Sequence, residues 1–287
     1  MKRRHLFAAL LACAAVFTAA HGETQARTVP ALFIAGDSTA AKYDAPDQQG
    51  WAEPFARYFD PAQLQINNRA RGGRSSRTFI TEGHWDQMLA EVQPGDFVMI
   101  QFGHNDAGAL NEEPPGSTRP LRARGTIPGT GDQSAEIDNV ITGKHEVVHT
   151  FGWYLRRMIA DVRAHGATPI LVTLTVTNNW NEERIACNTD YRRWDREVAD
   201  AEKVKLIDLT RIVTDRYQQL GPAAVAKFFD KDAVHPNPAG ADANARAVIA
   251  ALRATPDLPL AAALSAAGLQ VPADTGASPQ SVCPPLR

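Results

Sequence analysis

A serine near the start of the chain and an Asp-x-x-His pair near its end carry the side chains needed for nucleophilic catalysis. The serine is Ser38, and the pair is Asp232 and His235. A serine hydroxyl is a weak nucleophile until a base takes its proton, and a histidine base needs a carboxylate to hold its tautomer and stabilise its charged form. Neither motif is specific alone, since Gly-Asp-Ser is a common turn and Asp-x-x-His arises by chance. Together they predict a nucleophile, a base and an orienting acid.

Two more residues offer hydrogen-bond donors for the oxyanion that forms when a serine attacks an ester. Gly73 has no side chain to obstruct its backbone amide, and Asn105 has a side-chain amide that can donate. Each follows a predicted strand, as Ser38 does. The residues around Ser38 lack the Gly-x-Ser-x-Gly pattern of the α/β-hydrolases, which argues against that family.

The elements that would position these residues alternate between short apolar runs and longer stretches of helical period. Strands are expected at residues 31–35, 65–68, 97–102, 169–174 and 204–209. Helices are expected at about 50–59, 76–92, 146–165, 189–202, 210–220 and 239–253. This βαβ rhythm predicts a three-layer α/β/α sandwich around a five-stranded, mostly parallel sheet, with reactive groups at the carboxyl ends of the strands.

Four blocks of sequence, in this order, resemble those of the SGNH (GDSL-type) hydrolases. The blocks are Gly36-Asp37-Ser38-Thr39, Gly72-Gly73-Arg74-Ser75, Gly103-His104-Asn105-Asp106 and Asp232-Ala233-Val234-His235-Pro236. The chain is most similar to the rhamnogalacturonan acetylesterases, which also have counterparts of the stretches 50–53 and 177–180. The resemblance spans about residues 31–252. It implies a flavodoxin-like fold and hydrolysis of acetyl esters on a pectic polysaccharide.

The same resemblance assigns a role to each matching residue. Ser38 would attack, His235 would act as base and then as acid, and Asp232 would orient His235. The amides of Ser38 and Gly73 and the side chain of Asn105 would form the oxyanion hole. No metal and no cofactor are expected.

The N-terminal segment, the net charge and the cysteines together indicate an exported protein. Residues 1–22 combine a basic start with an apolar run of about 15 residues and a small-residue cleavage site, which is typical of a signal peptide. Removing the three basic residues Lys2, Arg3 and Arg4 takes the formal charge from −2 to −5, which argues against nucleic-acid binding. We expect a secreted or periplasmic monomer with no membrane span. Cys187 and Cys283 could then form a disulfide, and two free thiols remain the alternative.

A competing motif, His145-Glu146-Val147-Val148-His149, matches the His-Glu-x-x-His pattern of zinc proteases. That pattern works on a helix, where two histidines four residues apart share one face. A third histidine at position 155, which a metzincin would need, is replaced by Leu155. The alternative interpretation is the start of an amphipathic helix that packs on the sheet.

Substrate contacts are less specific in the sequence. Arg74 and Trp180 are candidates for binding sugars or uronate carboxylates, and Arg77 and Trp85 fit either that role or packing. Residues 107–144 are too long for a simple connection and are expected to form a substrate-shaping loop. The catalytic domain is expected to span 29–253, followed by a surface arm at 254–287 with one short helix at about 258–267.

The sequence thus predicts an esterase that removes acetyl groups from a plant cell-wall polysaccharide. Its expected partner is an acetylated polysaccharide or oligosaccharide. Three alternatives remain open at this point: a lipid esterase or thioesterase, a polysaccharide O-acetyltransferase of the same fold, and the zinc protease.

Overall fold

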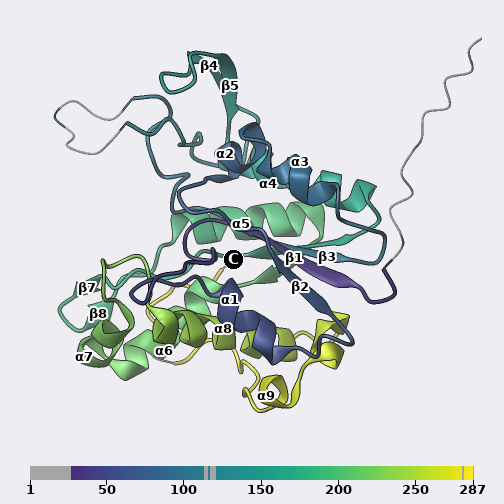
Figure 1. Ribbon diagram of the computed structural model, residues 1–287. Helices are drawn as coiled ribbons and strands as arrows, with labels where there is room; N and C mark the ends of the chain where they lie inside the picture. The colour runs from purple at the N-terminus through teal and green to yellow at the C-terminus, as the bar shows by residue number, and fades with distance from the viewer. Residues whose placement is uncertain (1–26, 113–115, 117–120, 280, 287) are drawn as a thin grey trace, which may run out of the picture.

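The computed structural model describes residues 27–112, 116, 121–279 and 281–286, and its centre is a five-stranded sheet (Figure 1). The strands are β1 (Ala31–Gly36), β2 (Gln65–Asn68), β3 (Phe97–Gln101), β6 (Thr168–Val172) and β9 (Lys205–Ile207). They lie in the order β2-β1-β3-β6-β9, and every neighbouring pair is parallel. The five predicted strands and their parallel arrangement are therefore confirmed.

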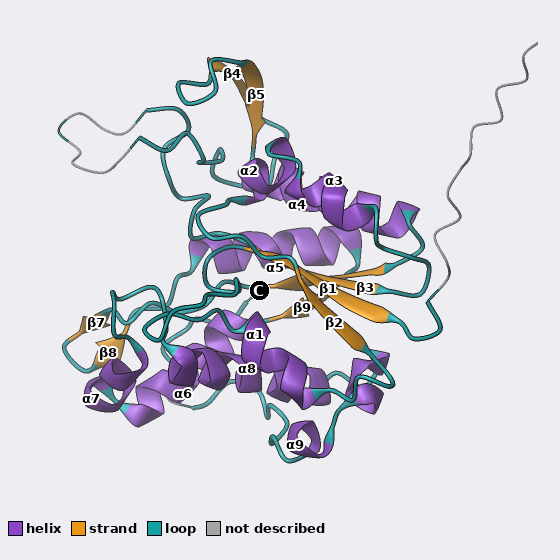
Figure 2. Cartoon of the chain, viewed as in Figure 1, coloured by secondary structure: helices purple, strands orange, loops and turns teal. Residues whose placement is uncertain are grey.

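Helices cover both faces of this sheet, as Figure 2 shows. One face carries α2 (Ser76–Thr81), α3 (His84–Leu89), α4 (Phe151–Ala164) and α5 (Asp190–Glu202). The other carries α1 (Ala52–Phe55), α6 (Leu209–Leu220) and α8 (Pro238–Arg253). Because successive side chains of a strand point to opposite faces, Phe33 packs under the first layer while Leu32 and Ile34 pack under the second. The continuous apolar run of β1 is thus explained by burial on both sides, and the three-layer sandwich is confirmed.

The register of the sheet brings the predicted blocks together. Gly36, the last residue of β1, pairs with Gln101, the last residue of β3. The chain therefore leaves both strands at the same level and in the same direction. Ser38 and Asn105 follow within a few residues of these ends, so they lie at one edge of the sheet.

Two predicted helices differ in the structure. The helix expected at 76–92 is divided into α2 and α3 at Gly83, whose φ of 79° lies in the left-handed region. The first residues of the helix expected at 146–165 instead form a strand, β5 (His145–His149), which pairs antiparallel with β4 (Ser134–Asp138). Helix α4 begins only after Thr150, whose side chain accepts a hydrogen bond from the amide of Trp153.

Smaller elements complete the chain. They are the paired strands β7 (Trp180–Asn181) and β8 (Arg184–Ile185), the helices α7 (Pro222–Val225) and α9 (Ala266–Leu269), and 3-10 helices at Ala56–Tyr58, Ala226–Phe228 and Pro259–Ala263. The 3-10 helix at Pro259–Ala263 and α9 replace the single short helix expected in the tail.

The tail beyond Arg253 is more than an arm on the surface. Leu260 and Val271 are buried in the core beneath α8, where each fully buried aliphatic side chain contributes about 1.5–3 kcal/mol. Cys283 forms a disulfide with Cys187, which closes a loop of 96 residues. The tail is thus packed against the core and covalently attached to the segment before α5. The boundaries of the predicted domain stay predictions.

The predicted signal peptide at 1–22 lies outside the described residues. Of the helices that the structure describes, none is both long and apolar enough to cross a membrane.

Candidate active site

The three predicted catalytic side chains form one hydrogen-bonded chain. Nε2 of His235 lies 2.9 Å from Oγ of Ser38, and Nδ1 of His235 lies 2.7 Å from Oδ2 of Asp232. The carboxylate can only accept from Nδ1, so that nitrogen carries its hydrogen and Nε2 is free to accept the serine proton. Ser38 and His235 are 197 residues apart in the sequence, and the parallel sheet brings them together.

Asp232 is held as a charged group by donors from its own loop. Its Oδ1 accepts hydrogen bonds from the backbone amides of Val234 and His235, both at 2.8 Å. Partial burial alone would raise the pKa of Asp232, but the hydrogen bonds from His235 and these amides lower it below its ordinary value. The carboxylate is therefore ionised at neutral pH and can stabilise a protonated His235.

The turn that presents Ser38 is fixed by the segment 50–51. The amide of Trp51 donates to the carbonyl of Thr39, and its ring Nε1 donates to Oε1 of Gln101 at 2.8 Å. A Cβ at Gly50 would lie only 2.2 Å from the carbonyl carbon of Ala40, so only glycine permits this close approach. The segment therefore locks the serine turn onto the end of β3.

The same region holds the loop of Asp232 and His235. The amide of Gln49 donates to the carbonyl of Pro236 at 2.8 Å, and Nζ of Lys231 donates to Oε1 of Gln48 at 2.8 Å. On the other side, Oδ1 of Asn237 accepts from the first amides of α8, which caps that helix. Residues 48–51 thus connect the nucleophile to its base.

These positioning residues were not predicted from the sequence. Asn237 followed by Pro238 is a recognisable helix start, so its capping role had a signal. Gln48 and Gln49 had none, since their roles depend on contacts nearly 190 residues away along the chain.

The predicted oxyanion donors lie beside Ser38. Gly73 has a φ of 79°, a left-handed conformation that favours glycine, and Nη1 of Arg124 donates to its carbonyl at 3.2 Å. Nδ2 of Asn105 donates one hydrogen to the carbonyl of Arg74 at 2.9 Å, which leaves a second N–H for a ligand. Ser38, Gly73 and Asn105 all line the same cavity. The structure therefore assembles the set that the sequence predicted.

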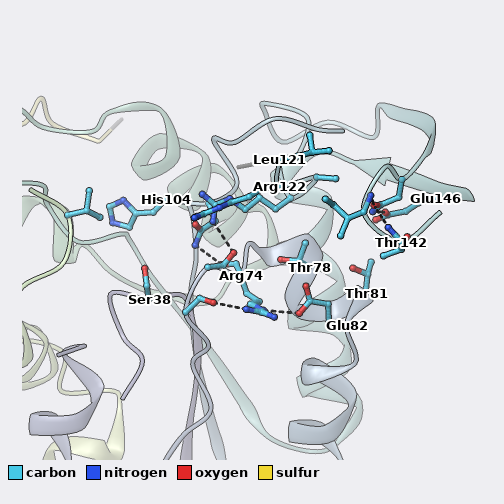
Figure 3. A pocket seen from close by; sticks show the side chains of 18 of the residues that line it. Ser38, Arg74, Thr78, Thr81, Glu82, His104, Leu121, Arg122, Thr142 and Glu146 are labelled. Carbon is cyan, nitrogen blue, oxygen red and sulfur yellow. Dashed lines mark hydrogen bonds and ion pairs between the residues drawn. The ribbon is translucent and has the colours of Figure 1, made fainter. Parts of the chain in front are cut away.

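This cavity has a volume of about 970 Å³ and is elongated. Figure 3 shows Ser38 and His104 at one end, Thr142 and Glu146 at the other, and Arg74 and Arg122 between them. The far end is built by the β4–β5 hairpin. Residues 121–124, which belong to the predicted substrate-shaping loop, line the cavity between the hairpin and Ser38. A space of this size is large enough for several sugar rings next to one reactive ester.

Comparison with known proteins identifies the family. Residues 34–243 match the model of the GDSL-like lipase/acylhydrolase family. The chain belongs to this family. It is 30% identical to a rhamnogalacturonan acetylesterase of Emericella nidulans over 76% of this chain and 84% of that protein. It is 31% identical to a probable rhamnogalacturonan acetylesterase of Bacillus subtilis over 69% of this chain and 78% of that protein.

A solved structure shares the architecture. The crystal structure of the protein YxiM from Bacillus subtilis superposes with a TM-score of 0.62 at 28% identity, covering 79% of this chain and 57% of that one. The resemblance stated from the four blocks is thus confirmed, and the chain is a carboxylic ester hydrolase of the GDSL family.

In this GDSL hydrolase the His-Glu-x-x-His segment forms strand β5. Residues four apart in a strand are about 13 Å apart, so His145 and His149 cannot bind one ion as they would on a helix. Glu146 accepts two hydrogen bonds from the guanidinium of Arg77, both at 2.7 Å. The helical premise of the zinc protease alternative is therefore wrong, and this glutamate anchors the hairpin to α2.

The candidate sugar contacts divide into two groups. Arg74 lines the cavity and forms an ion pair with Glu82 at 2.8 Å. Trp180 is absent from the described lining and packs against the core, with Nε1 donating to Asn178. Arg77 and Trp85 are fully buried, so their alternative role in packing is the correct one.

The side chains of His104 and Asp106 hold the loop of the third block in place. Nε2 of His104 lies 3.1 Å from Oγ1 of Thr175, and burial lowers the pKa of His104, which favours a neutral ring. The carboxyl of Asp106 is bonded to the amide and hydroxyl of Ser76 and to the amide of Gly103. Asp106 therefore joins the start of α2, just after Gly73, to the loop that carries Asn105.

Asp106 should make the stability of the enzyme depend on pH. Burial raises its pKa from 3.8 to about 7, although the hydrogen bonds from Ser76 and Gly103 oppose this. Between these values the unfolded chain releases a proton that the folded protein keeps, so stability falls as pH rises from about 4 to about 7. We expect the difference in unfolding free energy between wild type and Asp106→Asn to shrink by about 1–3 kcal/mol from pH 5 to pH 7.

Urea unfolding of both proteins at each pH measures this difference. The other titratable groups are the same in both proteins, so their contributions to the unfolding free energy cancel. Parallel stability curves would show that Asp106 has the same protonation state folded and unfolded over this range.

Proposed function

We propose that this hydrolase removes O-acetyl groups from a plant cell-wall polysaccharide, specifically rhamnogalacturonan, through an acetyl-serine intermediate. The observation that carries the proposal is the hydrogen-bonded chain Asp232–His235–Ser38, which opens into one end of a long cavity. An acetyl group at that end would leave the rest of the cavity for the sugar chain. The names of the similar enzymes from Emericella nidulans and Bacillus subtilis support this substrate.

The reaction proceeds in two halves. Oγ of Ser38 attacks the acetyl carbonyl carbon while Nε2 of His235 takes the serine proton. The negative oxygen of the tetrahedral intermediate accepts from the amides of Ser38 and Gly73 and from Nδ2 of Asn105. The carbon–oxygen bond to the sugar then breaks, and the sugar oxygen takes the proton from His235. Water, deprotonated by His235, attacks the acetyl-serine. The second intermediate collapses, the bond to Oγ of Ser38 breaks, and Oγ takes the proton back from His235, which releases acetate and restores Ser38.

The lining of the cavity favours a carbohydrate over a lipid. Its hydroxyl groups include those of Tyr43, Thr78, Thr81 and Thr142, which suit the hydroxyls of sugars. Its aliphatic side chains are few and lie apart in the sequence, at Leu121, Ala123, Ile141 and Val234. A long acyl chain would need a continuous apolar groove.

We also propose that the enzyme acts outside the cytoplasm. The predicted signal peptide supports export. The disulfide between Cys187 and Cys283 supports it independently, because such bonds persist in oxidising compartments.

A panel of substrates tests the proposed function. Purified enzyme should release acetate from acetylated rhamnogalacturonan with a kcat/KM at least about tenfold higher than from acetylated xylan, since one well-placed polar contact is worth about this factor. It should hydrolyse p-nitrophenyl acetate faster than p-nitrophenyl octanoate. Faster release of octanoate would support the lipid esterase alternative. Transfer of acetyl to an added oligosaccharide without release of acetate would support the acetyltransferase.

A further inference from the structure

The cavity carries more positive charge than its own acids neutralise. Glu82 is paired with Arg74 at 2.8 Å and with His84 at 3.2 Å. Glu146 is paired with the buried guanidinium of Arg77. Both carboxylates of the described lining therefore already form ion pairs with arginine.

Among the residues that the structure describes, three cations of the same lining have no carboxylate as an ion-pair partner. Lys231 donates to the neutral amide of Gln48, next to the catalytic loop. Arg122 and Lys144, farther along the cavity, have no ion pair with any residue in the described part of the chain. Arg122 and Lys144 are exposed to solvent, but they line one concave surface, and a concave surface lined by one sign of charge attracts an anion more strongly than isolated surface charges do. These cations predict a ligand that brings its own negative charge.

Lys144 stands on a turn whose shape is set by one side chain. Oδ1 of Asn139 accepts hydrogen bonds from the amides of Ile141 and Thr142, and the amide of Asn139 donates to the carbonyl of Lys144. Nδ2 of Asn139 also donates to Glu146 at 2.8 Å. Because Glu146 is held by Arg77 of α2, the turn is connected to the helix that starts just after Gly73. The position of Lys144 is thus coupled to the frame of the active site.

Arg122 lies between the two ends of the cavity. Figure 3 places it on the side of Leu121, across from Arg74, Thr78 and Glu82. A chain of sugars that starts at Ser38 and runs toward the hairpin would pass Arg122 first and Lys144 later. The planar guanidinium of Arg122 matches a carboxylate with two parallel hydrogen bonds, and the ammonium of Lys144 supplies a point charge.

We propose that Arg122 and Lys144 form a subsite that binds the carboxylates of uronate residues flanking the acetylated sugar. The inference rests on the proposed function and adds to it a mechanism of selectivity, since a neutral polysaccharide would leave both cations uncompensated. Leu121 and Ile141, which are 43% and 57% exposed in the same lining, would contact the apolar faces of the sugar rings.

Methyl esterification of the substrate gives a direct test, because it removes the carboxylate charge and keeps the sugar chain. For wild type, kcat/KM should be about tenfold or more higher on an acetylated rhamnogalacturonan oligosaccharide than on its methyl-esterified form. In Arg122→Gln/Lys144→Gln this ratio should fall to about one. Raising the salt concentration should lower the wild-type ratio as well. The matched control is Lys203→Gln, which removes an exposed charge at the end of α5, outside the cavity lining, and should keep the wild-type ratio.

Binding without turnover separates this inference from the proposed function. Calorimetric titration of Ser38→Ala with the unesterified oligosaccharide should show binding. The affinity should be about tenfold or more weaker in the triple variant that also carries Arg122→Gln and Lys144→Gln. Equal binding in both backgrounds, or equal affinity for the methyl ester, would overturn the subsite. If wild type releases no acetate from this oligosaccharide but charge-dependent binding persists, the proposed function fails and the subsite stands.

Discussion

Ser38→Ala should lower kcat for acetate release by about 10⁴-fold or more while the protein stays folded. The hydroxyl is the attacking group, and within the described part of the chain its side-chain hydrogen-bond partner is Nε2 of His235 at 2.9 Å. Alanine removes that bond but keeps the backbone of the turn, which is held by Asp37, Thr39 and Trp51. The amide of residue 38 also remains, so substrate binding should change little. Initial rates on p-nitrophenyl acetate and on acetylated rhamnogalacturonan measure the loss.

A matched control is Ser134→Ala, which changes an exposed serine of β4 outside the cavity lining and should retain full activity. The thermal midpoint of Ser38→Ala should lie within a few degrees of wild type, since a single hydrogen bond contributes about 1 kcal/mol. Activity of the folded variant near the wild-type level would refute Ser38 as nucleophile.

The sheet could be predicted because its physical cause is local. The strand 31–35 is apolar at every position, a pattern that requires burial on both faces, and Phe33 and Leu32 do pack into opposite layers. The carboxyl ends of parallel strands meet at one edge, so the order of Gly36, Gly73 and Asn105 along the chain was enough to place the candidate site.

The hairpin could not be predicted because its cause is distant. Residues 145–149 have the spacing of a helix start, and the β-branched Val147 and Val148 alone do not decide for a strand. What favours it is Glu146, whose partner Arg77 lies 69 residues earlier. Burial of an arginine without its carboxylate would be costly, so the pair selects the conformation in which both meet. The packing of Trp180 against the core could not be predicted for a related reason, since an aromatic side chain suits a hydrophobic core and a sugar-binding site equally well.

The disulfide and the tail show the same limit. Cys187 and Cys283 are 96 residues apart, and only the fold decides whether they meet. Their bond and the burial of Leu260 and Val271 tie the last segment to the core. The positions of the cysteines and of the tail can be read from the sequence, but not that the disulfide and the buried side chains both attach the tail to the domain.

Asp232→Asn should lower kcat by about 10³-fold and change KM by less than about threefold. An asparagine still fills the loop, but only one of its two terminal atoms is an acceptor. It cannot accept both from Nδ1 of His235 and from the amides of Val234 and His235, as the two oxygens of the carboxylate do. It also cannot stabilise the charged imidazolium. A buried carboxylate in this role is worth about 10⁴-fold, and the side chain of Asp232 is 41% exposed, so water offsets part of the loss.

The double variant Ser38→Ala/Asp232→Asn distinguishes orientation from an independent contribution. If Asp232 acts only through His235 on Ser38, the double variant should be no slower than Ser38→Ala alone, because the three residues work as one unit. Asp86→Asn, an exposed acid on α3, serves as the matched control and should keep wild-type kinetics. A full additive loss in the double variant would mean that Asp232 contributes to catalysis by a route that does not pass through the serine, such as direct contact with the substrate.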